Sequence, residues 1–184
     1  LLHSILPDSI VKRLKAEPGI NADRFEATTI LFADIVGFTK LSEKTPPAHL
    51  VALLNQMFSV FDELTSYYGL EKIKTIGDAY MVAGGIPIAR KDHAQAVADL
   101  ALEMRLKLAE FNQQQQQSFH IRIGIHTGSV IAGVIGIKKF VYDIWGDTVN
   151  VASRMESHGI PDVIQVSEAT YLVLKDQYQF VERG

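Results

Sequence analysis

The sequence predicts an α+β domain of the ferredoxin-like type, a split βαβ sheet as in polymerase palms, with its helices on one face and further elements added at the C-terminal side. Two observations predict this class. Short β-branched apolar runs alternate with two long helical patterns, and Gly-rich turns separate neighbouring runs in the order β-α-β-β-α-β. The 184 residues, 47% of them hydrophobic, can bury one substantial core. We therefore expect one main domain over residues 26–184, preceded by a connector over residues 1–25.

The connector is predicted to be helical. Apolar side chains recur at near-helical spacing from Leu2 to Leu14, around Pro7, until the sequence EPG breaks the pattern. We expect a helix that couples an upstream regulatory domain to the main domain, or else an ordinary N-terminal helix packed on the core. Because the sequence opens on LLH rather than on Met, we expect it to be part of a longer protein.

The first half of the main domain contains three predicted strands and one helix. Residues 28–33 are apolar and β-branched, as in a buried strand. An apolar stripe at i, i+3, i+4 and i+7 predicts a core-facing helix over residues 50–64 that ends near Gly69. Two short strands follow at residues 71–75 and 79–83, joined by a tight Gly-Asp turn.

The second half begins with a second amphipathic helix over residues 97–111. The run of glutamines at 113–117 predicts a short loop. Residues 119–126 alternate like a strand, and residues 128–135 are predicted to form its hairpin partner. A third helix is expected from about residue 145 to 157.

Asp34 and Asp78 each lie at the junction between a predicted strand and a turn. Such aspartates are common turn formers or helix caps when taken singly. As a pair at one edge of a sheet, however, they can hold two Mg²⁺ or Mn²⁺ ions, the arrangement that serves phosphoryl displacement. Gly37 follows Asp34 closely and frees the backbone to bring amides near an anion. The pair therefore predicts chemistry on a nucleotide.

Composition excludes several classes of function. The net charge of −3 argues against a nucleic-acid partner, because such a surface needs clustered Lys and Arg. The absence of Cys excludes disulfides and thiolate catalysis, and it suits a cytoplasmic location of the domain. No apolar run reaches the length of a membrane span, although membrane attachment of a longer parent protein stays open.

We expect His93 and His126 to be structural, since neither has a second ligand-type residue at metal-site spacing.

Four motifs follow one another along the chain, namely FADIVGFT at 32–39, KIKTIGDAYM at 72–81, RIGIHTG at 122–128 and WGDTVNVASRM at 145–155. In their order and spacing, the chain resembles over residues 26–184 the catalytic domain of class III nucleotidyl cyclases, the adenylyl and guanylyl cyclases. The resemblance implies that Asp34 and Asp78, with the backbone carbonyl of Ile35, bind two Mg²⁺ or Mn²⁺ ions per site.

The same resemblance assigns the triphosphate contacts. The amides of Gly37, Phe38 and Thr39 would bind the β- and γ-phosphates, as backbone groups at a helix N-terminus can. Arg122 would be a further phosphate contact, although an Arg on an alternating strand is in other proteins often merely solvated.

Asn150 and Arg154 stand four residues apart, and so project from one side of a helix. In most proteins such a pair is a polar surface feature. In the family, the Asn orients the ribose and the Arg stabilises negative charge that develops on the α-phosphate, a contribution of about 3–4 kcal/mol for a well-placed group.

Lys74 and Asp143 are expected to select the purine. Adenine presents an acceptor at N1 and a donor at N6, which match the donors of Lys74 and the acceptors of Asp143. In guanylyl cyclases the corresponding positions are typically Glu and Cys. The resemblance is therefore to the adenylyl type, and the expected reaction is attack of the ATP ribose 3′-hydroxyl on the α-phosphate, giving 3′,5′-cyclic AMP and pyrophosphate.

Family members work as dimers with sites shared between subunits, and this chain carries both halves of a site. We therefore expect a homodimer with shared active sites. The family also continues beyond residue 184 into a strand pair with a Lys that contacts the triphosphate, and this pair is expected to be missing here. The alternatives are a guanylyl cyclase and a non-catalytic nucleotide-binding or dimerisation module.

Overall fold

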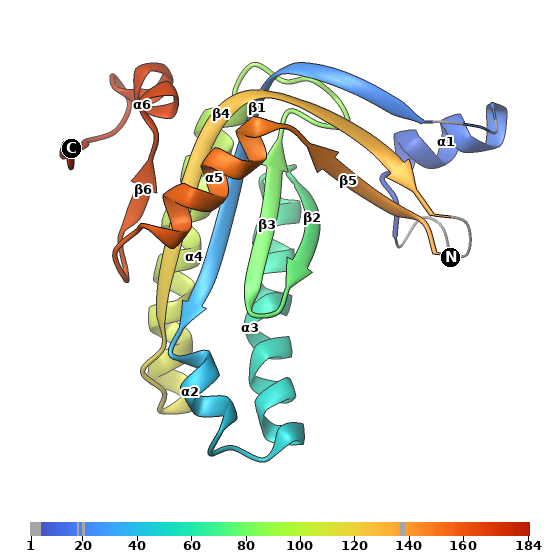
Figure 1. Cartoon of the computed structure of the whole chain (residues 1–184). Coiled ribbons are helices and arrows are strands. Elements are labelled where there is room, and N and C mark those ends of the chain that lie inside the picture. Colours follow the sequence, from blue (N-terminus) through green and yellow to red (C-terminus); the bar gives the residue numbers. More distant parts are fainter. Residues whose placement is uncertain (1–4, 18, 20, 137–138) are drawn as a thin grey trace.

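The computed structural model describes residues 5–17, 19, 21–136 and 139–184. Leu1–Ser4, and with them the first turn of the predicted connector helix, lie outside these residues. Figure 1 shows an α+β arrangement in which long helices lie against one curved sheet. The elements are α1 (Asp8–Ala16), β1 (Ala22–Val36), α2 (Phe38–Ser42), α3 (Pro47–Tyr67), β2 (Glu71–Ile76), β3 (Ala79–Gly84), α4 (His93–Gln115), β4 (His120–Ile135), β5 (Val141–Trp145), α5 (Asp147–Ser157), β6 (Ile164–Val166) and α6 (Glu168–Leu174).

β1 lies at the centre of the sheet. The strand order is β2-β3-β1-β4-β5, and β6 pairs in parallel with β4. The other pairs are antiparallel, and their register places Asp34 of β1 opposite Ala79 of β3 on one side and opposite Arg122 of β4 on the other. The central strand thus brings residues from distant parts of the sequence to one end of the sheet.

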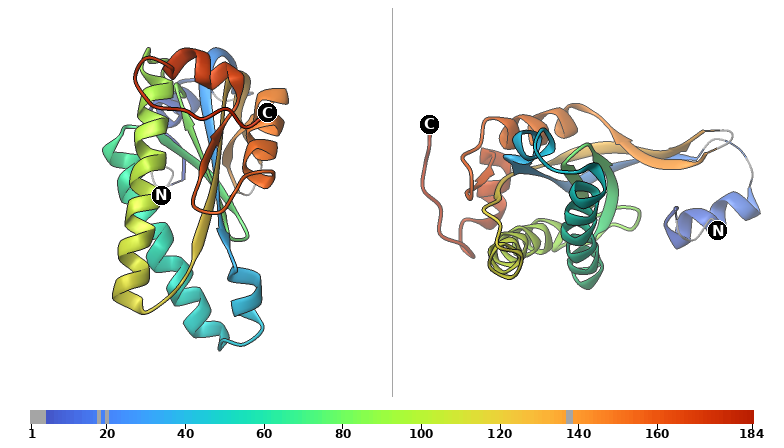
Figure 2. Two further views of the ribbon diagram at one scale, coloured as in Figure 1. Left: turned by 90° about the vertical axis from the view of Figure 1, so that its left-hand side faces the viewer. Right: turned by 90° about the horizontal axis from the view of Figure 1, so that it is seen from below.

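The two long helices, α3 and α4, pack on the same face of the sheet, where they cover the alternate β1 side chains Leu31, Ala33 and Ile35. The opposite face is not left open. Ile30 and Phe32 belong to a second apolar cluster, to which α1 and α5 contribute. Figure 2, seen from below, shows α3 and α4 on one side of the sheet and α5 on the other. The prediction of helices on one face therefore describes α3 and α4, whereas the added α5 covers part of the other face.

Two local predictions were wrong. Residues 128–135 are not a hairpin partner of residues 119–126, because both belong to the single strand β4, whose antiparallel neighbour is β5. The glutamine run is not a loop from its start, because Gln113 to Gln115 form the last turn of α4 and the left-handed Gln116 caps it. Gln is a good helix former, so low complexity did not indicate a helix end here.

The boundary predicted between residues 25 and 26 falls inside a strand. β1 begins at Ala22, and its first residues already pair with β4, up to a register shift between Phe25 and Thr28.

The turn at Gly77 and Asp78 is confirmed, and Gly77 has the positive φ of 60° that favours glycine. In the part of the chain that the structure describes, no helix has both the length and the apolar character of a membrane span.

Candidate active site

Asp34 and Asp78 are adjacent in the structure. Asp34 stands two residues before the end of β1, and Asp78 occupies the turn between β2 and β3. The backbone amide of Ile35 donates a hydrogen bond to the backbone carbonyl of Asp78, with an N···O distance of 3.4 Å. Burial raises the pKa of Asp34, the neighbouring Asp78 carboxylate raises it further, and the Arg122 guanidinium partly offsets both effects. The two carboxylates therefore repel each other unless a cation is shared between them.

The residues present fit a divalent cation. Oδ1 of Asp34 is buried and has no hydrogen-bond partner among the described residues, and carboxylate oxygens are the ligands that Mg²⁺ and Mn²⁺ prefer. Within the described part of the chain, no group of three or more acidic, His or Cys side chains is arranged to hold a metal. Two protein carboxylates with substrate oxygens are the usual ligands of Mg²⁺ in nucleotide sites. The pair Asp34 and Asp78 matches that pattern.

Arg122 lies between two carboxylates. Its Nη2 donates to Oδ2 of Asp34 at 3.1 Å, and its Nε lies 3.1 Å from Oε2 of Glu156 without the alignment of a hydrogen bond. Arg122 is therefore not simply a solvated strand residue. Its guanidinium is held beside the Asp34 carboxylate, where phosphate oxygens would also lie if a cation bridged them to Asp34.

Glu156 lies beside Arg122 at the candidate site, and it is not among the residues predicted from the sequence. It is 8% exposed, and burial, with a smaller effect of the Asp34 carboxylate, raises the pKa of Glu156 to about 6. One signal for it was available. Thr148, Ala152 and Glu156 recur every four residues on the buried side of α5, and a carboxylate on such a face usually has a specific partner.

Two glycines of β4 allow α5 to lie close enough for this contact. A Cβ on Gly124 would come within 2.0 Å of the backbone nitrogen of Glu156, and a Cβ on Gly128 within 2.5 Å of the Thr148 hydroxyl. Neither glycine has a positive φ, so their role is space rather than backbone conformation. The predicted motif RIGIHTG thus combines the Arg122 side chain with the packing surface for α5.

The glycine loop leads directly into a helix. Gly37 adopts a left-handed conformation with φ of 87° and precedes α2. A Cβ on Gly37 would meet no atom within 4 Å, so the space beside it is open. The first amides of a helix lack intrahelical acceptors, and the amides of Phe38 and Thr39 belong to this turn. They are available to an anion near Asp34.

Lys74 and Asp143 come together from different parts of the sequence. Lys74 Nζ donates to Oδ2 of Asp143 at 2.9 Å, and the Ile144 amide donates to Oδ1 of Asp143 at 2.8 Å. Asp143 is buried, whereas the Lys74 side chain is 39% exposed. The two residues predicted to read the purine therefore present a donor and an acceptor at one place.

Asn150 and Arg154 do not join the carboxylates of their own chain. Both are exposed, and neither side chain has a hydrogen bond or ion pair with another described residue. On α5 they lie away from the buried face that carries Ala152 and Glu156. The two side chains thus point away from the sheet on which their helix packs.

His93 and His126 make structural contacts. Nδ1 of His93 lies 2.7 Å from the Thr29 hydroxyl, and Nδ1 of His126 lies 2.6 Å from the hydroxyl of Ser167. Desolvation lowers the pKa of both histidines, which favours their neutral form.

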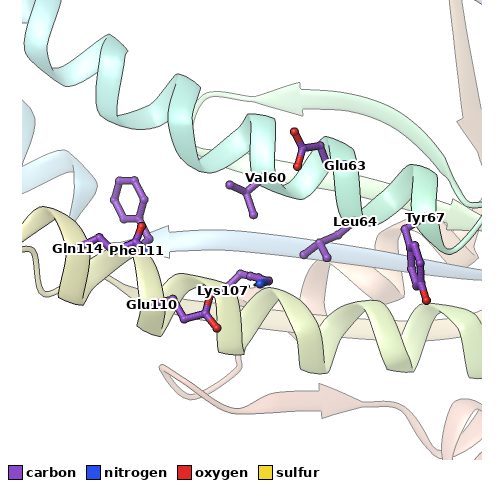
Figure 3. A pocket seen from close by; sticks show the side chains of 8 residues that line it. All are labelled: Val60, Glu63, Leu64, Tyr67, Lys107, Glu110, Phe111 and Gln114. Carbon is purple, nitrogen blue, oxygen red and sulfur yellow. Dashed lines mark hydrogen bonds and ion pairs between the residues drawn. The ribbon is translucent and has the colours of Figure 1, made fainter.

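A groove of about 430 Å³ lies elsewhere, between α3 and α4. Figure 3 shows the side chains that line it, and none of them is a predicted site residue. Its Lys107 and Glu110 form an ion pair at 3.2 Å, and the groove lies on helices remote from the outward side of α5. Its lining residues are Val60, Glu63, Leu64, Tyr67, Lys107, Glu110, Phe111 and Gln114.

Comparison with known proteins gives one consistent family. The model of the adenylate and guanylate cyclase catalytic domain matches residues 20–184. An adenylate cyclase of Mycobacterium bovis is 49% identical over 185 residues, which cover 100% of this chain and 42% of that protein. Guanylate cyclase soluble subunit beta-2 of Rattus norvegicus is 46% identical over 186 residues, which cover 100% of this chain and 27% of that protein.

A solved structure agrees with this match. The guanylate cyclase domain of RhGC from Catenaria anguillulae, determined in complex with GTP, superimposes with a TM-score of 0.82 at 36% identity and covers 85% of this chain and 86% of its own. The chain spans less than half the length of the two curated relatives, 42% of one and 27% of the other.

Proposed function

The chain belongs to the family of adenylate and guanylate cyclase catalytic domains, and from this premise we propose that it converts ATP into 3′,5′-cyclic AMP and pyrophosphate. The relatives alone leave the purine open, because one is named an adenylate cyclase and another a guanylate cyclase. The choice of ATP is carried by one observation, the contact of Lys74 with Asp143 at 2.9 Å. It places a donor and an acceptor side by side, as N1 and N6 of adenine require.

Guanine is disfavoured by the same pair. Its N1 and N2 are donors and its O6 is an acceptor, so GTP would set donors against Lys74 and an acceptor against Asp143. A site that is built to hydrogen-bond one ligand rejects a ligand of the wrong polarity by up to about 10⁴-fold, because buried polar groups are left unpaired. Asp143 is buried, which makes such a mismatch costly.

The carboxylates of Asp34 and Asp78, with the Ile35 carbonyl, would hold two Mg²⁺ or Mn²⁺ ions. Oδ1 of Asp34 has no hydrogen-bond partner among the described residues, which supports this assignment. When bound, such ions lower the pKa of the ribose 3′-hydroxyl and neutralise charge on the departing pyrophosphate. Arg122 would bind the β- and γ-phosphates together with the backbone amides of Gly37, Phe38 and Thr39.

Asn150 would orient the ribose, and Arg154 would stabilise negative charge on the α-phosphate. Cyclisation is intramolecular, so much of the rate enhancement comes from holding the ribose in a reactive geometry. No protein nucleophile is needed for this reaction.

We infer a homodimer with shared active sites. The exposed positions of Asn150 and Arg154, away from Asp34 of their own chain, support this arrangement. In a two-fold dimer each chain would give these two residues to the site whose carboxylates belong to its partner.

The strand order β2-β3-β1-β4, with α3 and α4 on one face, supports a ferredoxin-like core. The absence of Cys supports a cytoplasmic domain, and an upstream regulatory domain would account for the greater length of the relatives.

The test is cyclic nucleotide formation from ATP and from GTP with Mg²⁺ or Mn²⁺, measured across a dilution series of the full-length protein. We expect cyclic AMP from ATP, with specific activity that falls on dilution as dimers dissociate. Cyclic GMP, formed from GTP as the main product, would instead identify a guanylyl cyclase. No product from either nucleotide, in a folded dimer, would identify a non-catalytic module.

A further inference from the structure

Glu156 and Arg122 face each other through atoms that have no hydrogen-bond partner among the residues that the structure describes. Oε2 of Glu156 and Nε of Arg122 are both buried and lie 3.1 Å apart. The carboxylate is held in place by the backbone of α5, which touches β4 at Gly124. Glu156 is therefore fixed relative to the strand from which Arg122 projects.

The guanidinium of Arg122 is held from two sides. Its Nη2 contacts Asp34 and its Nε faces Glu156, each at 3.1 Å. A guanidinium is planar and presents its donors as a rigid fork, so two contacts on different nitrogens define the orientation of the whole group. Loss of one contact would leave the group free to rotate about its remaining bonds.

The Asp34 contact is the one that substrate would weaken. If Asp34 engages cations, as the proposed function requires, its negative charge is shared with them and the attraction to Arg122 falls. The Glu156 contact does not involve the cation carboxylates and persists. Resting on that function, we propose that Glu156 is a positioning residue that keeps the Arg122 guanidinium directed at the triphosphate while Asp34 is occupied.

A purely structural role for Glu156 makes a different prediction. Burial of the Glu156 carboxylate costs folding free energy that its unaligned contact with Arg122 offsets only in part, so a neutral amide of the same shape should leave the fold as stable or more stable. A role confined to packing would therefore be satisfied by Glu156→Gln with no change in ligand binding. A positioning role requires weaker binding in a protein that is equally stable.

The experiment measures binding of α,β-methylene-ATP with Mg²⁺ by calorimetry, and thermal unfolding, in the full-length protein and in Glu156→Gln. We expect Glu156→Gln to unfold at the same temperature or higher and to bind the analogue about 10- to 100-fold more weakly, the usual effect of removing a group that orients a ligand-binding residue. Cyclic AMP formation should fall by a similar factor. Glu110→Gln, which removes a carboxylate from the exposed side of α4, is the matched control and should bind as the unmutated protein does.

The dependence on Arg122 is tested by a double-mutant cycle. In an Arg122→Ala background, Glu156→Gln should change analogue binding by less than about twofold, because the group that it positions is gone. An undiminished effect in that background would overturn the proposal. If Arg122→Ala does not fold, the second readout is the Nε–H NMR resonance of Arg122. This resonance is identified by its loss in Arg122→Lys. An unchanged Nε–H resonance in Glu156→Gln would overturn the proposal.

The experiment separates a failure of the cyclase function from a failure of the role of Glu156. If the unmutated protein binds no analogue and forms no cyclic AMP, both the proposed function and the role of Glu156 are overturned. If the unmutated protein binds the analogue and Glu156→Gln binds it equally well, only the role of Glu156 is overturned.

Discussion

Lys74 and Asp143 are 69 positions apart in the sequence, yet their side chains meet at 2.9 Å. The Lys74 side chain is 39% exposed, and a partly exposed ion pair contributes little to stability, about 0–1 kcal/mol. Under the proposed function, the pair would therefore matter for recognition of the base rather than for stability. The Ile144 amide donates to one oxygen of Asp143 and Lys74 donates to the other, so a donor and an acceptor are held side by side.

Exchange of this pair should change the preferred nucleotide. In Lys74→Glu with Asp143→Cys, the Glu accepts from guanine N1 and N2, and the thiol no longer repels O6. We expect the ratio of kcat/KM for GTP to that for ATP to rise at least about 100-fold. Lys72→Gln, on the same strand, is the control and should leave the ratio unchanged. An unchanged ratio in the double variant would contradict the assignment of these residues to the base.

Removal of one cation carboxylate should abolish activity without unfolding the protein. Burial and Asp78 raise the pKa of Asp34, so the neutral amide in Asp34→Asn relieves a repulsion and should not lower the unfolding temperature. We expect cyclic AMP formation to fall at least about 1,000-fold, because electrostatic stabilisation of the transferred phosphate is lost. Unfolding temperature measured with and without Mn²⁺ checks the cause. Mn²⁺ should raise the unfolding temperature of the exposed control Asp176→Asn and should not raise that of Asp34→Asn. An equal rise in Asp34→Asn would argue against this cation site.

Two inactive variants should complement each other if the sites are shared. Asp34→Asn and Arg154→Ala disable different halves of a site, so a mixed dimer keeps one intact site of its two. Random mixing in equal amounts makes half of the dimers mixed, and activity should return to about a quarter of the unmutated level. The matched control mixes Asp34→Asn with Asp78→Asn, which damage the same half and should restore nothing. Equal activity in both mixtures would rule out the shared arrangement.

Gly124 should tolerate no side chain. A Cβ there would come within 2.0 Å of the backbone of α5, and backbone atoms cannot move aside as a flexible side chain can. We expect Gly124→Ala to destabilise the protein by about 2–3 kcal/mol, a fall of roughly 4–12 °C in the unfolding temperature for a domain of this size. Ser153→Ala, on the exposed side of α5, should unfold within about 1 °C of the unmutated protein. Normal stability of Gly124→Ala would mean that α5 does not pack this closely.

Glu71 should make stability depend on pH. Burial, with a smaller effect of the Asp8 carboxylate, raises the pKa of Glu71 from 4.5 to about 7. The stabilising effect of its bound proton is therefore complete below pH 4.5 and is lost as the pH rises through about 7. At pH 8, Glu71→Gln should be the more stable protein, by at most about 3 kcal/mol at 1.36 kcal/mol per pKa unit.

Thermal unfolding of both proteins at pH 4 and pH 8 checks this expectation. The difference in unfolding temperature should be small at pH 4 and clear at pH 8. Glu182→Gln, at an exposed position near the end of the chain, should show no difference at either pH. Equal unfolding temperatures of Glu71→Gln and the unmutated protein at pH 8 would show that Glu71 is not desolvated.

Some features of the fold could be predicted because their signals are local. The apolar stripes of α3 and α4 follow the helical period, and Gly77 marks a turn by its own conformational freedom. At Gly128, by contrast, the structure differs from the prediction. It resembles a turn residue in the sequence, but it lies inside β4 and makes room for Thr148. That reason depends on a residue 20 positions away, so no local pattern could reveal it.

The sequence by itself determined the long helices, the central strand and the chemical groups that the chain offers, because propensity, hydrophobic period and side-chain type are properties of single residues and short segments. Only the tertiary structure decided which groups meet. The contact of Arg122 with Glu156 and the outward position of Arg154 depend on how far α5 approaches β4 and how it is rotated on the sheet. Both depend on packing between segments far apart in the sequence, where strand register and the space beside Gly124 set the distances.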